Sequence, residues 1–220
     1  MIKVLPSTNP CNEDDLVDYV RSISNLGIEY IHCDVMDGNF VQNKCLPFEL
    51  VEKIKNNVNI LLDIHLMVDD VVGFVKHFAL VKPSIITIHY EAPKSTREIL
   101  KVIKYLKKRD ILVGLSIKPN TPIEIIERFL DYIDLILIMS VEPGKSGQKF
   151  IDDTYEKVKK AKELIKGKDI LIEVDGGINI EIAQKLKKLG CDFLVMGSAF
   201  YNEKEKSKLL NSIDKHYKLT

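Results

Sequence analysis

Short runs of valine, isoleucine and leucine alternate along the chain with longer segments whose apolar residues recur every three or four positions. The short runs predict buried strands, and the longer segments predict amphipathic helices. The eight expected strands span residues 2–6, 30–34, 60–65, 85–89, 112–117, 135–139, 170–174 and 193–196. The expected helices span residues 13–25, 48–56, 71–80, 95–109, 123–130, 153–166, 180–189 and 203–217, and the pattern is weakest in 71–80.

Eight repeated strand and helix units within 220 residues leave little room for a second domain. We therefore predict an α/β fold in which residues 1–220 form a single (β/α)8 TIM barrel with parallel strands. An open, doubly wound sheet is the alternative architecture. In a barrel of this kind the reactive groups collect where the strands end and the following loops begin, so the strand ends are the expected place for chemistry.

Composition narrows the possible partners. Lysine plus arginine and aspartate plus glutamate both number 32, so no net charge attracts nucleic acid or an anionic membrane surface. We expect neither as a partner, and an anionic ligand must be captured locally. The four cysteines are widely spaced and form no CxxC pair, and the first residues lack the pattern of a signal peptide. A reducing, cytoplasmic location is therefore expected.

Polar side chains that can bind metals occur at three of the expected strand ends. His32 and Asp34 are two positions apart on a strand, so both side chains point to the same face, and Met36 continues that row. His65 ends the next strand and Asp175 follows the seventh. Two imidazoles and two carboxylates could hold a divalent transition metal, and zinc, iron, manganese and cobalt are all chemically suitable. A hydrogen-bonded His–Asp pair without a metal is the alternative for the first strand alone.

Further residues at the strand ends are open to two interpretations. Met36, Met67 and Met139 either pack in the core or line a pocket. His89 is either a residue of the active rim or a core histidine with its own hydrogen-bond partners.

Loops rich in small residues follow the last three strands. They read MSVEPGKSGQ after the sixth strand, DGGIN after the seventh and MGSA after the eighth. Backbone amides in such loops can approach an anion closely, and phosphate binding by these loops is a recurrent use of the barrel. Any one of the loops could also be a simple connector, but three in succession favour a phosphate site.

Five separated segments match, in order, the motifs of a known family. The first is HCDVMDGNFVQN at residues 32–43, where the family pattern is HxDxMDGxFVxN. The others are LDIHLM at 62–67, PNTP at 119–122, LIMSVEPGKSGQKFI at 137–151 and EVDGGIN at 173–179. The chain therefore resembles the ribulose-phosphate 3-epimerase family over nearly its whole length.

The resemblance implies a metal-dependent isomerase that inverts C3 of a small phosphorylated ketose. The implied reaction converts D-ribulose 5-phosphate to D-xylulose 5-phosphate in the pentose phosphate pathway. His32, Asp34, His65 and Asp175 are implied to bind one divalent metal ion, with zinc the first candidate and iron, manganese and cobalt the others. Relatives of this kind often self-associate, so a homo-oligomer is expected.

Asp34 and Asp175 are implied to be the two catalytic acid–base groups, acting through an enediolate. Epimerisation removes a proton from one face of a carbon and returns one to the other face, so two groups on opposite sides are needed. The residues implied to contact the substrate are Ser7, Met36, His65, Met67, Met139, Gly144, Gly147, Gly176, Gly177, Gly197 and Ser198.

The sequence also departs from the family pattern. GKSGQ at residues 144–148 stands where the family usually has GFGGQ, so Lys145 and Ser146 change a loop expected near the phosphate. The segment NKCLPFE at residues 43–49 is more similar to that of D-allulose-6-phosphate 3-epimerases. A D-allulose-6-phosphate 3-epimerase is therefore an alternative, although DGGIN favours the pentose enzyme. A non-catalytic sugar-phosphate-binding barrel and a metal-free phosphosugar barrel are further alternatives, against which the retained His and Asp residues argue.

Overall fold

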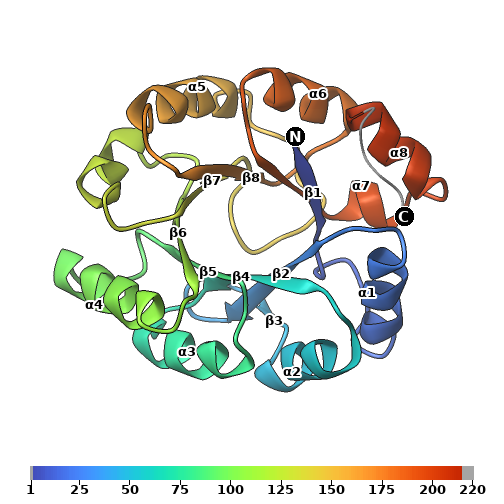
Figure 1. Cartoon of the computed structure of the whole chain (residues 1–220), viewed down its shortest axis with the longest axis horizontal. Helices are drawn as coiled ribbons and strands as arrows, with labels where there is room; N and C mark the ends of the chain where they lie inside the picture. The colour runs from blue at the N-terminus through green and yellow to red at the C-terminus, as the bar shows by residue number, and fades with distance from the viewer. Residues whose placement is uncertain (1, 215–220) are drawn as a thin grey trace.

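The computed structural model describes residues 2–214, in which a ring of parallel strands is surrounded by helices (Figure 1). The strands are β1 (Lys3–Pro6), β2 (Tyr30–Asp37), β3 (Lys44–Cys45), β4 (Leu61–Met67), β5 (Ile85–His89), β6 (Leu112–Ile117), β7 (Leu135–Met139), β8 (Leu171–Asp175) and β9 (Phe193–Met196). The α-helices are α1 (Leu16–Ser24), α2 (Phe48–Asn57), α3 (Val71–Phe78), α4 (Thr96–Lys107), α5 (Thr154–Leu164), α6 (Ile180–Lys188), α7 (Ser198–Tyr201) and α8 (Lys206–Ile213). The 3-10 helices are η1 (Ala79–Val81) and η2 (Ile123–Phe129).

The sheet closes on itself. Its strand order is β1, β9, β8, β7, β6, β5, β4 and β2, and each neighbouring pair is parallel. The ring is completed where Ser7, just after β1, forms a parallel bridge with His32 of β2. The backbone N–H of Thr8 donates to the carbonyl oxygen of His32 at 2.9 Å. The predicted TIM barrel is confirmed, and the open-sheet alternative is wrong.

Side chains alternate between the inside of the barrel and the layer beneath the helices, as the strand pleat requires. In β7, Leu135, Leu137 and Met139 belong to the apolar cluster inside the barrel. Ile136 and Ile138, which lie between them, belong to the larger cluster that packs against the helices. The interior is thus filled by side chains, and a functional site can form only at an end of the barrel.

The antiparallel strand β3 was not expected from the sequence. Lys44 and Cys45 pair with Asp37 and Met36, so a neighbouring strand, rather than a local pattern, creates this element. β2 also continues to Asp37, beyond the expected residues 30–34.

Two expected helices also differ. Residues 123–130 were expected to be an α-helix, but the segment is the 3-10 helix η2. It follows Pro122, and the N–H of Ile125 donates to the carbonyl oxygen of Pro122 at 3.3 Å, which is the three-residue spacing of a 3-10 helix. The helix expected over residues 203–217 begins only at Lys206 and is preceded by the separate helix α7. Residues 215–217 of that expectation lie outside the described part of the chain.

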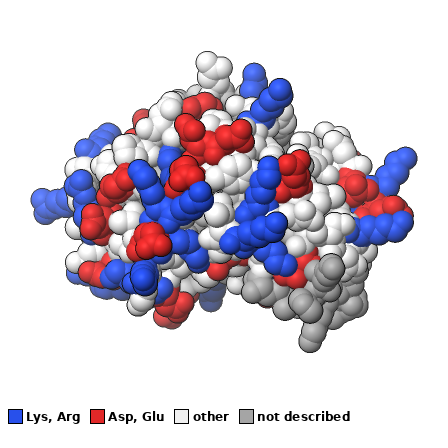
Figure 2. Space-filling model, turned by 90° about the horizontal axis from the view of Figure 1, so that it is seen from above, with Lys and Arg blue, Asp and Glu red and all other residues white. Residues whose placement is uncertain are grey.

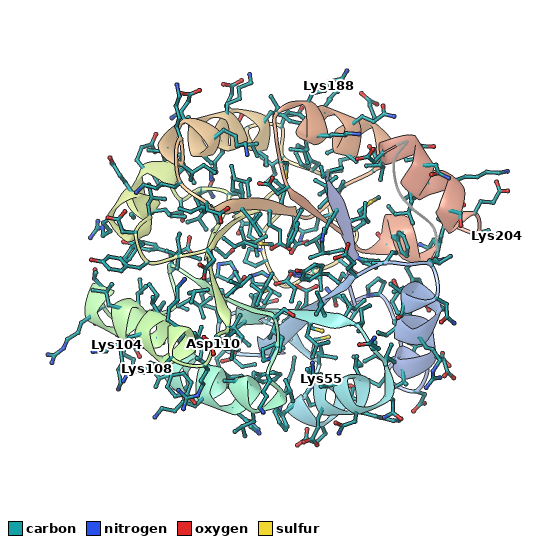
Figure 3. The ribbon with its side chains drawn as sticks, in the orientation of Figure 1. Lys55, Lys104, Lys108, Asp110, Lys188 and Lys204 are labelled. Atoms are coloured by element: carbon teal, nitrogen blue, oxygen red, sulfur yellow. The ribbon has the colours of Figure 1, made fainter. Side chains whose placement is uncertain are left out.

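The helices present their charged side chains to solvent. Lys104, Lys188 and Lys204 are exposed and project outward in Figure 3. On the face shown in Figure 2, lysine and arginine side chains are interspersed with aspartate and glutamate, in line with the balanced composition. None of the helices described for residues 2–214 combines the length and the apolar character needed to cross a membrane.

Candidate active site

β2 carries two site residues to the inside of the barrel. Ile31 and Cys33 pack outward against the helices, so His32 and Asp34 point inward, as their spacing predicted. Both are buried, with 0% and 4% of their surfaces exposed. Ser7 binds Asp34 from the adjacent strand end, because its Oγ donates to Oδ2 of Asp34 at 2.7 Å.

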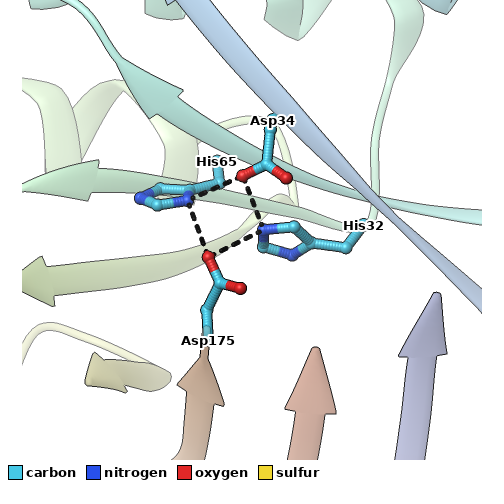
Figure 4. A group of neighbouring side chains, drawn as sticks. All are labelled: His32, Asp34, His65 and Asp175. Atoms are coloured by element: carbon cyan, nitrogen blue, oxygen red, sulfur yellow. Dashed lines mark hydrogen bonds and ion pairs between the residues drawn. The ribbon is translucent and has the colours of Figure 1, made fainter. Parts of the chain in front are cut away.

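β4 and β8 supply the other two residues of the cluster. His65 is the register neighbour of Asp34 on β4, and Asp175 is the last residue of β8. Figure 4 shows Asp34 and Asp175 approaching the two imidazoles from opposite sides. Oδ1 of Asp34 lies 3.3 Å from Nε2 of His32 and 3.3 Å from Nδ1 of His65. Oδ2 of Asp175 lies 4.0 Å and 3.9 Å from the same nitrogens.

The cluster has the donor set and the spacing of a metal site. One ligand atom from each of His32, Asp34, His65 and Asp175 lies within 4.8 Å of all the others. Ligand atoms on a tetrahedral zinc ion lie about 3.4 Å apart, given bonds of about 2.1 Å. Nε2 of His32 is buried and has no hydrogen-bond partner within the described chain, a deficit that a metal–ligand bond would remove. The four residues therefore fit a divalent metal ion.

The opposite nitrogen of His32 is held by a buried carboxylate. Nδ1 lies 2.6 Å from Oδ2 of Asp63 and 3.3 Å from Oε1 of Glu173. A proton on Nδ1, donated to Asp63, leaves the Nε2 lone pair facing the cluster. Burial, reinforced by the charge of Asp63, raises the pKa of Glu173 well above its usual value. His32, Asp63 and Glu173 are also close enough together to hold a cation, but the short hydrogen bond already uses the Nδ1 atom of His32.

The two aspartates have opposite shifts in pKa. Burial alone would raise the pKa of Asp34, but the adjacent imidazoles of His32 and His65 outweigh burial and lower it strongly. Burial and the negative charge of Asp34 raise the pKa of Asp175 from 3.8 to about 7. At neutral pH the site thus combines a carboxylate with a carboxyl group that can still carry a proton.

A cavity opens at the end of the barrel that carries the aspartates, and most of the predicted site residues line it. They are Ser7, Asp34, Met36, Met67, Met139, Gly144, Gly147, Asp175, Gly176, Gly177, Gly197 and Ser198. His32 and His65 are fully buried and do not line the cavity. The cavity wall therefore contains every residue that the resemblance implied to contact the substrate except His65, and the three methionines are both core residues and part of this wall.

The loop after β8 requires glycine where it meets the loop after β7. Gly177 has φ of 63°, and a Cβ atom there would lie 2.5 Å from the backbone N of Phe150 and 2.8 Å from the carbonyl oxygen of Gln148. Because both of these atoms belong to the backbone, no side-chain movement could relieve the overlap. Glycine at this position therefore allows the two loops to pack side by side at the edge of the cavity.

Sequence reasoning missed the buried partners of the imidazoles. Asp63 precedes His65 by two positions and Glu173 precedes Asp175 by two positions. Strand alternation places each of these pairs on the same inward face, so this signal was available. Asn9, Gln148 and Asn179 also line the cavity and were not singled out, and only the folded chain places them there.

Known proteins resemble this chain over almost its whole length. The model of the "Ribulose-phosphate 3 epimerase family" matches residues 3–201. The chain belongs to this family. A ribulose-phosphate 3-epimerase of Bacillus subtilis is 36% identical over 216 residues, which is 97% of this chain and 98% of the relative. One from Buchnera aphidicola is 42% identical over 197 residues, which is 86% of this chain and 82% of the relative.

Solved structures with low sequence identity share the fold. A 3-hexulose-6-phosphate synthase from Salmonella typhimurium superposes with a TM-score of 0.72 at 15% identity, and 97% of each chain is covered. A tryptophan synthase alpha-subunit from Pyrococcus furiosus gives a TM-score of 0.66 at 14% identity, with 97% of this chain and 99% of the other covered. At such identities the likeness is evidence for the barrel architecture of this epimerase-family chain and for nothing further.

Proposed function

We propose that this chain is a metal-dependent epimerase that interconverts D-ribulose 5-phosphate and D-xylulose 5-phosphate by inverting C3. The observation that carries the proposal is the meeting of Asp34 and Asp175, from opposite sides, at one cluster with two imidazoles. Inversion at a carbon next to a carbonyl needs one group on each face of that carbon, and this pair satisfies the need.

The positions of the two aspartates on opposite sides of the cluster give them complementary tasks. In one direction Asp34 acts as the carboxylate that removes the C3 proton from one face of the ketose, and Asp175 acts as the carboxylic acid that delivers a proton to the other face. The roles are exchanged in the reverse direction. Between the two transfers the substrate is a planar enediolate. Ser7 holds Asp34 in place through its hydroxyl group.

His32, Asp34, His65 and Asp175 would hold the metal ion in this proposal. When bound, the ion supplies positive charge beside the carbonyl oxygen of the ketose, where negative charge develops. Zinc suits two nitrogen and two oxygen ligands, and iron, manganese or cobalt would accept the same set. Asp63 supports the arrangement by fixing the orientation of His32.

The wall of the cavity supplies the rest of the substrate site. The thioethers of Met36, Met67 and Met139 form an apolar surface against which the planar intermediate would pack and from which water is excluded. The phosphate group is assigned to the loops after β7, β8 and β9, whose backbone N–H groups can approach an anion. The residues of those loops proposed to contact it are Gly144, Gly147, Gly176, Gly177, Gly197 and Ser198.

A second substrate is kept for a specific reason. The segment that resembles D-allulose-6-phosphate 3-epimerases forms β3, and its Cys45 pairs with Met36 of the cavity wall. Its unusual sequence therefore lies next to the place where a ketose would bind, and D-allulose 6-phosphate is the alternative substrate.

The four cysteines are free thiols, which supports the proposed cytoplasmic location.

A coupled assay tests the proposal and separates the substrates. The purified protein is loaded with zinc, and its kcat/KM is measured for D-ribulose 5-phosphate and for D-allulose 6-phosphate. We expect the pentose phosphate to be favoured at least tenfold, and we expect dialysis against a chelator to remove the activity. Preference for the hexose phosphate would show that D-allulose 6-phosphate is the better substrate. Full activity without metal would contradict the proposed metal dependence.

A further inference from the structure

His65 connects the proposed metal-ligand cluster (His32, Asp34, His65 and Asp175) to a row of hydrogen-bonded side chains. Nδ1 of His65 faces Asp34 and Asp175, while its Nε2 lies 2.9 Å from Nε2 of His89. Nδ1 of His89 in turn lies 3.2 Å from Oε2 of Glu91. His65 and His89 are fully buried, so their ring nitrogens have no access to water, whereas the Glu91 side chain is 20% exposed. The mechanism proposed above uses neither His89 nor Glu91.

Two neutral imidazoles beside a charged Glu91 can hydrogen-bond along His65–His89–Glu91 in only one direction. A carboxylate accepts hydrogen bonds and donates none, so Nδ1 of His89 carries the proton that Glu91 accepts. A neutral imidazole has one N–H, so Nε2 of His89 is an acceptor and receives the Nε2–H of His65. Nδ1 of His65 is then left with a free lone pair, and this is the atom that faces the proposed metal ion.

Glu91 is held firmly from its other side. Its Oε1 accepts the backbone N–H of Lys118 at 2.8 Å and the hydroxyl group of Thr121. Nζ of Lys157 donates to the carbonyl oxygens of Lys118, Pro119 and Thr121, which fixes the loop that anchors Glu91. Although burial opposes ionisation, hydrogen bonds from His89, Thr121 and Lys118 lower the pKa of Glu91 to about 2. Glu91 is therefore a charged acceptor whose two oxygens are both used.

An aromatic side chain covers the middle of this row. The ring of Phe40, from the loop between β2 and β3, lies 4.9 Å from the ring of His89 between centroids. Nζ of Lys118 lies 4.2 Å from the centroid of the Phe40 ring. Phe40 therefore contributes to the complete burial of His89.

We propose that Glu91 is a positioning residue which, through His89, fixes the His65 imidazole in the tautomer whose Nδ1 can bind the metal ion. The inference rests on the proposed function, because it assumes that His65 is a metal ligand. It adds two residues, His89 and Glu91, that set the protonation and the orientation of this ligand without touching the substrate.

Glu91→Gln is the deciding variant because it keeps the shape and changes the hydrogen bonding. Two donors, the Lys118 N–H and the Thr121 hydroxyl, hold one oxygen of residue 91, so the glutamine oxygen faces them and its NH2 group faces His89. His89 must then accept at Nδ1 and donate from Nε2. That reversal moves the proton of His65 onto Nδ1, where it competes with the metal.

The test measures zinc affinity by competition with a chelator, together with thermal unfolding. We expect Glu91→Gln to weaken zinc binding tenfold to a hundredfold while it still unfolds cooperatively. Glu91→Asp keeps a charged acceptor and should bind zinc more tightly than the glutamine variant, whereas a purely space-filling role would give the opposite order. Glu124→Gln, the same change at an exposed ion pair with Lys160, is the control and should bind zinc like the wild type. Wild-type affinity in Glu91→Gln would overturn the proposal.

A second measurement needs no variant. The imidazole nitrogen-15 shifts of the zinc-loaded wild type should show protonated Nδ1 in His89 and protonated Nε2 in His65. The reverse tautomer at His89 would overturn the proposal, whatever the variants do. Failure of the proposed function gives a different result, because the wild-type protein would then bind no zinc and lack epimerase activity.

Discussion

Asp34 and Asp175 lie in the same buried cluster, but they differ in pKa because their distances to the imidazoles differ. Asp34 lies 3.3 Å from both imidazoles and accepts the hydroxyl of Ser7, whereas Asp175 is about 4 Å from the same rings and faces the charge of Asp34. The nearer aspartate takes most of the favourable interactions and stays ionised. Without a metal ion, the pKa of the farther one is about 7, so a single buried cluster can contain both an ionised and a protonatable carboxyl group.

Asp175→Asn tests this division of tasks. Asparagine keeps the size of the side chain but cannot exchange a proton, so we expect kcat to fall by at least about 10³-fold. The circular dichroism spectrum should be unchanged. Asp131→Asn, which alters an exposed partner of Lys168, should retain normal turnover. Ordinary activity in Asp175→Asn would remove Asp175 from the acid–base pair.

At the scale of elements, the site depends on strand ends and on the loops that follow them. β2, β4 and β8 supply the metal-ligand cluster, and the loops after β7, β8 and β9 supply the glycines. The loop after β7 is joined to the β2–β3 loop, because Nδ2 of Asn43 donates to the carbonyl oxygen of Gly144 at 2.6 Å. Within the loop, Nε2 of Gln148 donates to the carbonyl oxygens of Glu142 and Lys145. These hydrogen bonds stabilise the loop that contains Lys145.

Lys145→Met tests whether that loop contacts the phosphate. Lys145 is the one basic residue among the described residues that line the cavity, and its side chain is exposed. Loss of a solvent-screened ionic contact weakens binding by about 0.5–1 kcal/mol, so we expect KM to rise about twofold to fivefold with kcat nearly unchanged. The control is Lys149→Met, which changes an exposed lysine outside the cavity lining. Equal KM values for both variants would show that Lys145 does not contact the phosphate.

At the scale of the whole molecule, the barrel stabilises a cluster that would be unfavourable without a metal ion. Its strands hold His32, Asp34, His65 and Asp175 beneath or beside apolar side chains, where ionised groups lose their hydration. Folding therefore changes the proton affinity of these groups, and we expect the stability of the barrel to depend on pH and on a bound metal ion.

Urea unfolding with and without zinc tests this linkage. Without metal, the pKa of Asp175 rises from 3.8 in the unfolded chain to about 7. The folded state then keeps a proton that the unfolded chain has released, so this group's contribution to stability falls as the pH rises between those two values. The buried histidines His65 and His89 have lowered pKa values and act in the opposite direction, so the comparison is made with Asp175→Asn.

In that comparison, metal-free wild type should lose up to about 4 kcal/mol relative to Asp175→Asn between pH 4 and 7. Zinc favours the ionised carboxylate and should abolish this relative loss. A difference in free energy of unfolding that stays constant with pH in the absence of metal would show that Asp175 has an ordinary pKa.

The sequence by itself determined the repeated architecture and predicted the cluster of two histidines and two aspartates. Strand alternation fixed His32 and Asp34 on one face, and the periodicity of apolar residues located the eight strands of the barrel to within a few residues. These features are local, because they depend on residues only a few positions apart.

Only the tertiary structure decided the features that arise between distant segments. β3 exists because Cys45 meets Met36 of another strand, and η2 is a 3-10 helix although its sequence has helical periodicity. The interpretation of His89 also stayed open until His65 and Glu91 were placed on either side of it. The opposite shifts in the pKa values of Asp34 and Asp175 depend on burial and on charges from other strands. Hydrogen bonding, burial and electrostatics at these positions are set by distances in space, which the order of residues along the chain does not contain.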